Sequence, residues 1–538
     1  MPVIESNVDR NSEQFQRNRE EMLAEIQRFR DVEAKVRATE ESKRDKYHER
    51  GQILPRERVN LLLDHGSPFL ELSTLCGYKH HDDKDGSLAG GNTIIGIGYV
   101  RGVRCLISAS NSAIKGGTMT PWGVQKTLRC QDIALENNLP IVSLIESGGA
   151  NLLYQAELFI PGGKTFANQA RHSAAGLPQV TVVHGSSTAG GAYMPGLSDH
   201  VVMVRGNAKV FLAGPPLLKA ATGEVATDEE LGGADMHGTQ AGTTEYLAEN
   251  DVDGIRLARE IMGELGWNDY YTPPPVRDYK PPRYDIDDLC GVVPADYSKP
   301  YDIREVVARL VDDSDFLEFK ADLDQQTICG RGKIEGYTVG FIGNNGPITT
   351  KGANKAGQFI QLCCQSNTPI VFLMNTTGYM VGTDSEQNGM VKHGSKMIQA
   401  VANATVPQIT IVCGGSFGAG NYGMCGRGFS PRFIFAWPNS RTSVMGGEQA
   451  AKVMAIITEE KMAKAGQDID QKNLEAMQQQ IIDQFEAESD SLAATARLFD
   501  DGLIDPRDTR RVLGYTLSIC REAEARKVTP NTFGVARF

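Results

Sequence analysis

The sequence contains an internal repeat, and this repeat constrains the fold more than any other feature. Residues 126–140 (KTLRCQDIALENNLP) match residues 355–369 (KAGQFIQLCCQSNTP), and residues 177–185 match residues 406–414, both at an offset of 229 positions. A constant offset held over about 60 residues indicates a duplicated unit. Each copy alternates short apolar runs with longer helical patterns, which is typical of an α/β fold with βαβ connections. We therefore expect two copies of one α/β domain.

Changes in composition predict where these domains begin and end. Residues 12–48 are highly charged and repeat apolar side chains at helical spacing, which predicts a helix packed on its own domain or on a neighbouring subunit. Proline is concentrated between Trp267 and Pro300, where it excludes a helix interior or a central strand and indicates a linker. The expected parts are an N-terminal helical segment, a first domain, a linker and a second domain, with bounds 1–57, 58–266, 267–300 and 301–538.

Overall composition excludes several classes of function. The chain has 55 Lys and Arg against 67 Asp and Glu, a net charge of −12, which disfavours nucleic-acid binding. It contains no apolar run of the length that spans a bilayer. The first residues have neither a basic nor an apolar leader pattern, so we expect a cytoplasmic protein. The ten cysteines include no Cys-x-x-Cys pair, and we expect no metal site.

Each copy has a small-residue turn after a strand-like run, and these turns are the candidate catalytic sites. The first turn contains Gly190 and Gly191, and the second contains Ala419 and Gly420 at the same positions of the repeat. Backbone N–H groups at a helix start stabilise negative charge when small residues let a ligand approach closely. Such a pair can also serve packing alone. Its occurrence in both copies makes an oxyanion site an equally good interpretation.

A second glycine turn precedes each of these turns. It contains Gly148, Gly149 and Ala150 in the first copy, and Gly378 and Tyr379 in the second. Each turn follows a strand-like run, and ligands of α/β sheets bind at the carboxyl ends of strands. Two adjacent strand ends could each present one N–H to a thioester or amide oxygen.

Other motifs are weaker. The GGSFG string around Ser416 matches a hydrolase nucleophile elbow, but no histidine follows His393, so the required order of the triad is missing. The GxGxxxG strings lack dinucleotide-binding spacing. We expect the KHHDDKD run at 79–85 to be an exposed acidic loop rather than a metal site. Lys115 lies in a glycine turn, where it could bind a phosphate or be merely exposed.

Several longer segments resemble one enzyme family. They are RGQILPRERVNLLLDHGSPFLELS, SGGANL, STAGGAYMPGLSD, FLAGPPLLKAATGEVATDEELGGADMH, AWPNSRTSVMGGEQAA and DGLIDPRDTRRVLGYTLSI. The sequence is similar to carboxyltransferase β subunits of biotin-dependent acyl-CoA carboxylases, in the branch acting on geranyl-CoA and 3-methylcrotonyl-CoA. The resemblance implies two crotonase-like domains per subunit. It also implies active sites between subunits, with acyl-CoA on the first domain and carboxybiotin on the second.

The resemblance also implies a mechanism and a partner. The family's oxyanion sites fall on the pairs at 190–191 and 419–420, although many relatives have Gly-Ala at the second pair. The first pair, with Ala150, would hold the dienolate of the substrate, and the second would hold the biotin enolate. The chain has no Ala-Met-Lys-Met biotin motif and no ATP-binding glycine loop. A partner α subunit would therefore carry biotin and use ATP and bicarbonate, in a β6 or α6β6 assembly.

The segment 153–170 favours geranyl-CoA as the substrate. Relatives acting on 3-methylcrotonyl-CoA tend to have a bulky aromatic residue where this chain has Ala167. A smaller residue would leave room for an added isoprene unit, although Ala167 could equally pack a helix. 3-Methylcrotonyl-CoA, a decarboxylase activity and a purely structural β subunit remain the alternatives. The predicted substrate-binding residues are Lys115, Gly148, Gly149, Ala150, Ala167, Tyr193, Gly378, Tyr379, Phe417 and Tyr422.

Overall fold

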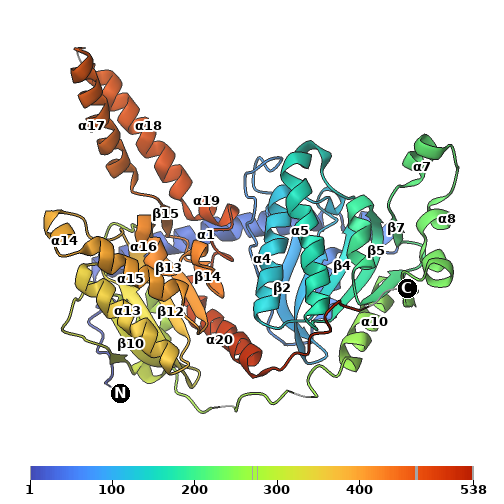
Figure 1. Ribbon diagram of the computed structural model, residues 1–538, viewed down its shortest axis with the longest axis horizontal. Coiled ribbons are helices and arrows are strands. Elements are labelled where there is room, and N and C mark those ends of the chain that lie inside the picture. Colours follow the sequence, from blue (N-terminus) through green and yellow to red (C-terminus); the bar gives the residue numbers. More distant parts are fainter. Residues whose placement is uncertain (1, 270, 276, 467–469, 536–538) are drawn as a thin grey trace. The chain divides into compact units, whose positions relative to one another are not determined.

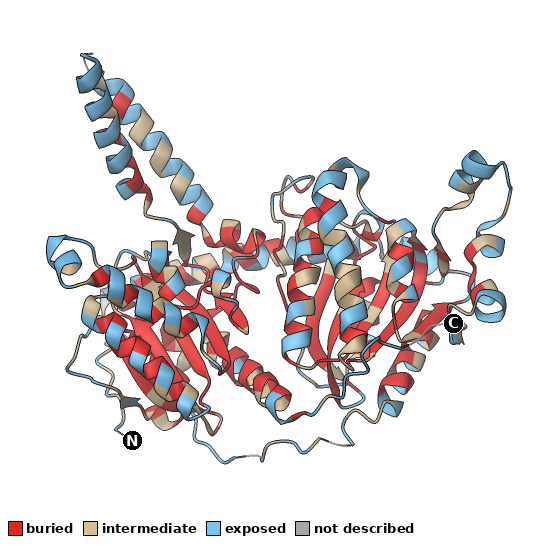
Figure 2. Ribbon diagram, viewed as in Figure 1, coloured by how far each residue is buried: buried red, intermediate tan, exposed pale blue. Residues whose placement is uncertain are grey.

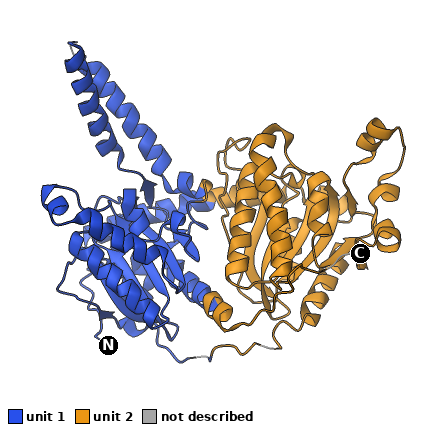
Figure 3. Cartoon of the chain, viewed as in Figure 1, with its two compact units in different colours: residues 1–30, 275–495, 499–518 blue, residues 31–274, 496–498, 519–538 orange. Residues whose placement is uncertain are grey.

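The computed structural model describes residues 2–269, 271–275, 277–466 and 470–535. The chain divides into two compact units, which Figure 3 shows in different colours. Each unit contains one copy of the repeat together with short segments from elsewhere in the chain. Unit 1 comprises residues 1–30, 275–495 and 499–518, and unit 2 comprises residues 31–274, 496–498 and 519–538.

Unit 2 is built on an eight-stranded sheet that contains the first copy of the repeat. The strand order is β1-β2-β3-β4-β5-β6-β8, and β7 pairs with the end of β5. The pairs β1–β2 and β2–β3 are antiparallel, whereas the remaining pairs are parallel. The strands are β1 Leu70–Glu71, β2 Thr93–Val100, β3 Val103–Ser110, β4 Ile141–Ser147, β5 Gln179–Thr188, β6 His200–Val204, β7 Lys209–Phe211 and β8 Tyr246–Ala248.

Unit 1 repeats this architecture with a seven-stranded sheet. The strand order is β14-β13-β12-β11-β10-β9, and β15 pairs with the end of β13. Again the first two pairs along the chain, β9–β10 and β10–β11, are antiparallel and the others are parallel. The strands are β9 Leu317–Glu318, β10 Thr327–Ile334, β11 Tyr337–Asn344, β12 Ile370–Thr376, β13 Gln408–Phe417, β14 Phe433–Ala436 and β15 Arg441–Ser443.

Helices pack against the sheet within each unit. In unit 2, α4 and α5 lie side by side and α10 packs on β5 and β6; in unit 1, α13 and α15 lie side by side over the sheet (Figure 1). The longer helices are α1 Glu13–Glu41, α3 Pro55–Leu62, α4 Pro121–Glu136, α5 Gln155–Ala174, α7 Pro215–Thr222, α10 Asp251–Glu264, α12 Ile303–Leu310, α13 Thr350–Gln365, α15 Met390–Ala402, α17 Gly447–Ala465, α18 Gln471–Ser489 and α20 Thr509–Ala525. The shorter ones are α2 Arg44–Glu49, α6 Tyr193–Gly196, α8 Asp228–Gly232, α9 Ala234–Met236, α11 Leu289–Val292, α14 Thr383–Gln387, α16 Gly418–Gly423 and α19 Ser491–Ala496.

The central strands are apolar because helices and loops cover both faces of each sheet. All ten residues of β13 are buried, as expected for a parallel strand inside an α/β layer (Figure 2). The two copies share even an irregularity of register. The β4–β5 pairing shifts between Ile145 and Ser147, and the β12–β13 pairing shifts between the equivalent Met374 and Thr376. The duplication inferred from the sequence is therefore confirmed at the level of single residues.

Two segments outside the sheets test further expectations. The apolar face predicted within residues 12–48 is buried along α1, which is confirmed for Phe15, Met22, Ile26, Phe29 and Val36. The expectation that the proline-rich segment lacks helix is wrong for Ile286–Val292, which form a 3₁₀ turn followed by α11. This stretch contains no proline and buries Leu289 and Cys290 completely. Among the helices of the described residues, we find none with the length and hydrophobicity of a membrane span.

Candidate functional site

In each copy, a long buried strand ends in a small-residue turn that begins a short helix. β5 leads into residues 189–192, a 3₁₀ turn, and β13 leads directly into α16. The first residue of each turn has nearly the same left-handed backbone, with φ of +52° at Ala189 and +53° at Gly418. The first N–H groups of a helix have no partner within it. Each turn therefore offers backbone donors at the carboxyl end of a central strand.

The second glycine turn lies directly beside the first in both copies. Gly149 and Gly378 have left-handed φ of +86° and +122°. A Cβ atom added to Gly149 would lie 3.4 Å from the carbonyl oxygen of Thr188, and one added to Gly378 would lie 3.6 Å from that of Phe417. The structure thus brings the predicted residues together within each unit. These are Gly148, Gly149, Ala150, Gly190 and Gly191 in unit 2, and Gly378, Tyr379, Ala419 and Gly420 in unit 1.

In each copy, backbone pairing leaves one N–H group of the second glycine turn without a hydrogen bond. Ala150 forms a parallel bridge with Met119, whose N–H donates to Gly149 (2.9 Å) and whose carbonyl accepts from Asn151 (3.1 Å). The bonds are therefore made by the neighbours of Ala150. Among the described residues, the Ala150 N–H has no acceptor.

The same pattern recurs in the second copy. Ile348 bridges Tyr379 and exchanges its backbone bonds with Gly378 and Met380, both at 2.9 Å. Within the described residues, the Tyr379 N–H likewise has no acceptor. Each half of the chain therefore presents an unpaired N–H beside a small-residue turn.

The small-residue turns of the two copies differ in how much room they leave for an added side chain. A Cβ on Gly190 would meet only Phe166 and Met119, at 3.8 and 4.0 Å, and a Cβ on Gly191 would meet Ser187 Oγ at 3.4 Å. Neither glycine has a positive φ, so packing within the chain does not require glycine there. In contrast, a Cβ on Gly420 would lie 2.8 Å from the Cα of Gly378, so the fold itself requires this glycine.

Two aromatic side chains lie near the turn at 189–192. The rings of Phe166 and Tyr193 are 6.0 Å apart in an edge-to-face arrangement, and Tyr193 is exposed. Ala167 is half-buried on α5 beside Phe166. Phe166 and Met119 are the neighbours of Gly190 that sequence reasoning missed. The sequence could have indicated Phe166, because it directly precedes Ala167, which was predicted to bind the substrate.

The aromatic candidates of the second copy occupy different environments. Phe417 is buried and its ring packs 5.2 Å from that of Tyr297. The Tyr379 hydroxyl donates to the carbonyl of Gly394 (3.3 Å), and burial raises the pKa of this phenol well above its usual value. Tyr422 is exposed, with its ring 5.7 Å from that of Phe429. Tyr422 is thus the most accessible aromatic ring among these three.

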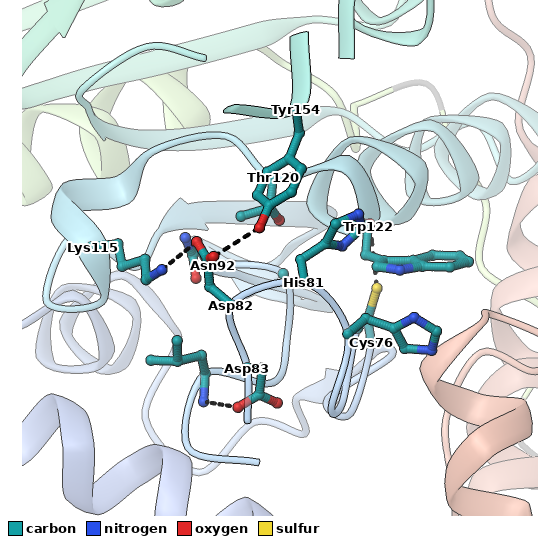
Figure 4. A pocket seen from close by; sticks show the side chains of 13 residues that line it. Cys76, His81, Asp82, Asp83, Asn92, Lys115, Thr120, Trp122 and Tyr154 are labelled. Atoms are coloured by element: carbon teal, nitrogen blue, oxygen red, sulfur yellow. Dashed lines mark hydrogen bonds and ion pairs between the residues drawn. The ribbon is translucent and has the colours of Figure 1, made fainter. Parts of the chain in front are cut away.

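The loop that contains KHHDDKD folds back as the wall of a pocket (Figure 4). The loop is exposed at Lys79, His81, Lys84 and Asp85, as expected. Asp83 is buried, however, and accepts the N–H groups of Lys79, Gly86 and Leu88, which closes the loop on itself. The ring of His80 packs 5.2 Å from that of Trp122, which also lines the pocket. Among the described residues, no group of three His, Cys, Asp or Glu side chains is placed to hold a metal ion.

Lys115 lies in the same pocket and is paired there. Its ammonium contacts the Asp82 carboxylate, which also accepts a 2.7 Å hydrogen bond from the Tyr154 hydroxyl (Figure 4). The hydrogen bond from Lys115 is the main cause that lowers the pKa of Asp82. A phosphate bound by Lys115 would have to compete with this carboxylate.

A buried charge network lies at the end of β4. The fully buried Arg58 bonds to Glu146 at 2.8 Å and to Asp251 at 2.9 Å. His184 Nδ1 is 2.9 Å from Asp251, and burial, assisted by the charge of Arg58, lowers the pKa of His184. His184 is therefore a buried structural partner of Asp251. Glu146 directly precedes Ser147, so the network anchors the end of β4.

Ser416 has no access to a substrate. Its side chain is fully buried, and its hydroxyl accepts a 2.8 Å hydrogen bond from Asn421 Nδ2. The GGSFG string is therefore a structural turn in this chain and not a nucleophile elbow.

Comparisons with known proteins extend across nearly the whole chain. Residues 46–535 match the family model of the carboxyl transferase domain. A solved structure, the β subunit of P. aeruginosa geranyl-CoA carboxylase, is 62% identical with a TM-score of 0.94, and all of both chains is covered. A probable mitochondrial methylcrotonoyl-CoA carboxylase beta chain from Drosophila melanogaster is 46% identical, covering 96% of this chain and 92% of its own length. A probable biotin-dependent acyl-coenzyme A carboxylase beta2 subunit from Mycobacterium tuberculosis is 49% identical, covering 92% of both.

Proposed function

The chain belongs to the carboxyl transferase family, and we propose that it is the β subunit of a geranyl-CoA carboxylase. As a family member it is the carboxyltransferase component of a biotin-dependent acyl-CoA carboxylase, and its α/β fold of two crotonase-like domains is confirmed. The observation that carries the choice of substrate is the 62% identity to a geranyl-CoA carboxylase β subunit over the full length of both chains. The proposed reaction transfers CO₂ to the γ-carbon of a 3-methyl-branched enoyl-CoA.

The turn in unit 2 supplies the oxyanion site for the acyl-CoA. In this proposal, the N–H groups of Gly190, Gly191 and Ala150 stabilise the negative charge that develops on the thioester oxygen when the γ-proton leaves. Loss of one such donor typically raises the barrier by about 2.7–4 kcal/mol. The loose surroundings of Gly190 support this role, because an added Cβ there would meet no atom closer than 3.8 Å.

The turn in unit 1 fits the ring oxygen of biotin. Ala419 is exposed, and among the described residues the neighbouring Tyr379 N–H has no acceptor. Ala419, Gly420 and Tyr379 would hold biotin through backbone N–H groups, which need no side-chain charge. When bound, biotin supplies CO₂ and a ring nitrogen that can accept a proton. The strand that leads into this turn, β13, is buried along its whole length.

The partner and the assembly complete the proposal. An α subunit would carry biotin and use ATP and bicarbonate, and the β subunits would assemble as β6, in an α6β6 complex. Active sites would then form between subunits. The first domain would comprise residues 58–266 and the second domain residues 301–538. Lys115 would bind the coenzyme A part of the substrate. A cytoplasmic location stays a prediction, since some relatives are named as mitochondrial.

The test is a substrate screen of the complex purified with its biotin-carrying partner. ATP-dependent fixation of labelled bicarbonate should be highest with geranyl-CoA. Omitting ATP should abolish it, which would exclude the decarboxylase alternative. A complex that fixes label on 3-methylcrotonyl-CoA and ignores geranyl-CoA would overturn the choice of substrate.

3-Methylcrotonyl-CoA is the second candidate substrate. Relatives from three organisms that are 44–46% identical are named methylcrotonoyl-CoA carboxylase beta chains. Both candidates share the branched enoyl thioester, so the same oxyanion site would serve either. They differ in length, which places the distinction in the acyl pocket beside α5.

A further inference from the structure

We propose that Ser147 and Thr376 are positioning residues that orient the two oxyanion turns, and this proposal rests on the proposed function. The two residues occupy equivalent positions of the repeat, at the ends of β4 and β12. Both are buried, and neither was singled out by the sequence. Their hydroxyl groups make the same backbone bonds in the two units.

Ser147 connects three parts of the first site. Its hydroxyl donates to the carbonyl of Gly117 (3.1 Å) and accepts from the N–H of Gly149 (3.2 Å). The latter bond fixes the glycine that precedes Ala150, whose own N–H has no acceptor among the described residues. Ser147 is also paired in register with Ser187, whose hydroxyl donates to the carbonyl of Gly191 (2.9 Å).

Thr376 repeats these bonds in the second site. Its hydroxyl accepts from the N–H of Gly378 (3.2 Å) and contacts the carbonyls of Gly346 and Gly378, both at 3.2 Å. Gly346 is the repeat equivalent of Gly117. The Thr376 methyl group would lie 2.9 Å from a Cβ on Gly420, so this side chain also packs against the small-residue turn of the second copy.

The shared geometry points to the orientation of donors as the common role. An oxyanion donor acts only when it is aimed at the position where charge develops. A side chain that accepts the N–H of residue 149 or 378 fixes the peptide before the unpaired donor at residue 150 or 379. Serine and threonine both supply this hydroxyl, so each residue should be able to replace the other.

The experiment compares Ser147→Ala and Thr376→Ala with Ser147→Thr and Thr376→Ser in the complete complex. Each alanine variant should lower kcat by roughly 10-fold to 100-fold, because a small displacement of a catalytic group has effects of this size. The KM for acyl-CoA should stay within about 3-fold, as expected when the lost interaction acts mainly in the transition state. Ser147→Thr and Thr376→Ser should retain most of the activity of the parent complex, because each keeps the hydroxyl group.

Thr181 and Thr410 provide matched controls. They are equivalent buried threonines near the starts of β5 and β13, and their hydroxyls bond to Ser198 (2.6 Å) and to the carbonyl of Cys425 (2.8 Å). Thr181→Val and Thr410→Val should lower the melting temperature with kcat retained. If these controls lose kcat as strongly as the alanine variants, or if exchange between serine and threonine fails to restore activity in a folded complex, the positioning role is overturned.

Amide hydrogen exchange separates this proposal from the substrate assignment. In the complete complex, Ser147→Ala should accelerate exchange at Gly149, and Thr376→Ala should do so at Gly378, while the Ser147→Thr and Thr376→Ser variants stay as slow as the parent. Unchanged exchange at these amides in the alanine variants overturns the proposal, whichever acyl-CoA is carboxylated. An inactive parent complex with the expected exchange pattern would instead refute the proposed function alone.

Discussion

Ala167 and Phe166 are adjacent on α5, yet they face different directions. Consecutive residues of a helix diverge by about 100°, and Phe166 is the one whose ring lies beside Gly190. Ala167 is half-buried.

Replacing Ala167 with phenylalanine tests whether this position limits chain length. Ala167→Phe should lower kcat/KM for geranyl-CoA by at least about 10-fold more than for 3-methylcrotonyl-CoA, because each buried methylene contributes about 0.8 kcal/mol. Steady-state kinetics on both substrates measure this ratio. Ala170→Phe places the same ring at an exposed position of α5 and should leave the ratio unchanged. Equal losses on both substrates in Ala167→Phe would show that residue 167 does not select the substrate.

The two strand–turn–helix elements should respond differently to an added methyl group. Gly191→Ala has ordinary contact distances within the chain, so the protein should fold normally while carboxylation falls about 100-fold through a blocked approach. Gly420→Ala places its Cβ against Gly378 and should destabilise the fold by about 1–3 kcal/mol as well as reduce activity. Thermal unfolding and steady-state assays of both variants measure the contrast. An unchanged melting temperature for Gly420→Ala would contradict the close packing at this turn.

The elements around the turns could be predicted because the repeat reports them twice. A pattern such as Gly190–Gly191 is ambiguous alone, but its recurrence at Ala419–Gly420 after a second apolar strand indicates a shared structure. The hydroxyls of Ser147 and Thr376 escaped prediction because single polar residues at strand ends are common. Their role depends on which carbonyl a separate loop brings near. The buried role of Asp83 in the loop at 79–85 escaped prediction for a related reason, since local charge does not reveal that Asp83 binds three backbone N–H groups.

At the scale of the whole molecule, each unit exposes apolar side chains that a monomer would leave in water. In unit 2, Leu152, Leu153, Phe159 and Ile160 are 74–81% exposed on and just before α5. In unit 1, the helical hairpin of α17 and α18 carries exposed Val453, Ile456 and Ile457 (Figure 2). Groups of exposed large apolar side chains are typical of sites of protein association. It supports the proposed assembly from several copies of the chain.

The purified β subunit should therefore sediment as an oligomer, with a mass that is a multiple of 58.5 kDa. Phe159→Glu with Ile160→Glu should shift the distribution toward smaller species, because burying two carboxylates at an interface is unfavourable. Lys164→Glu, an exposed change on the same helix, should leave the mass unchanged. Circular dichroism would establish that each variant retains its fold. A stable, fully active monomer of the parent chain would contradict both the association and an active site shared between subunits.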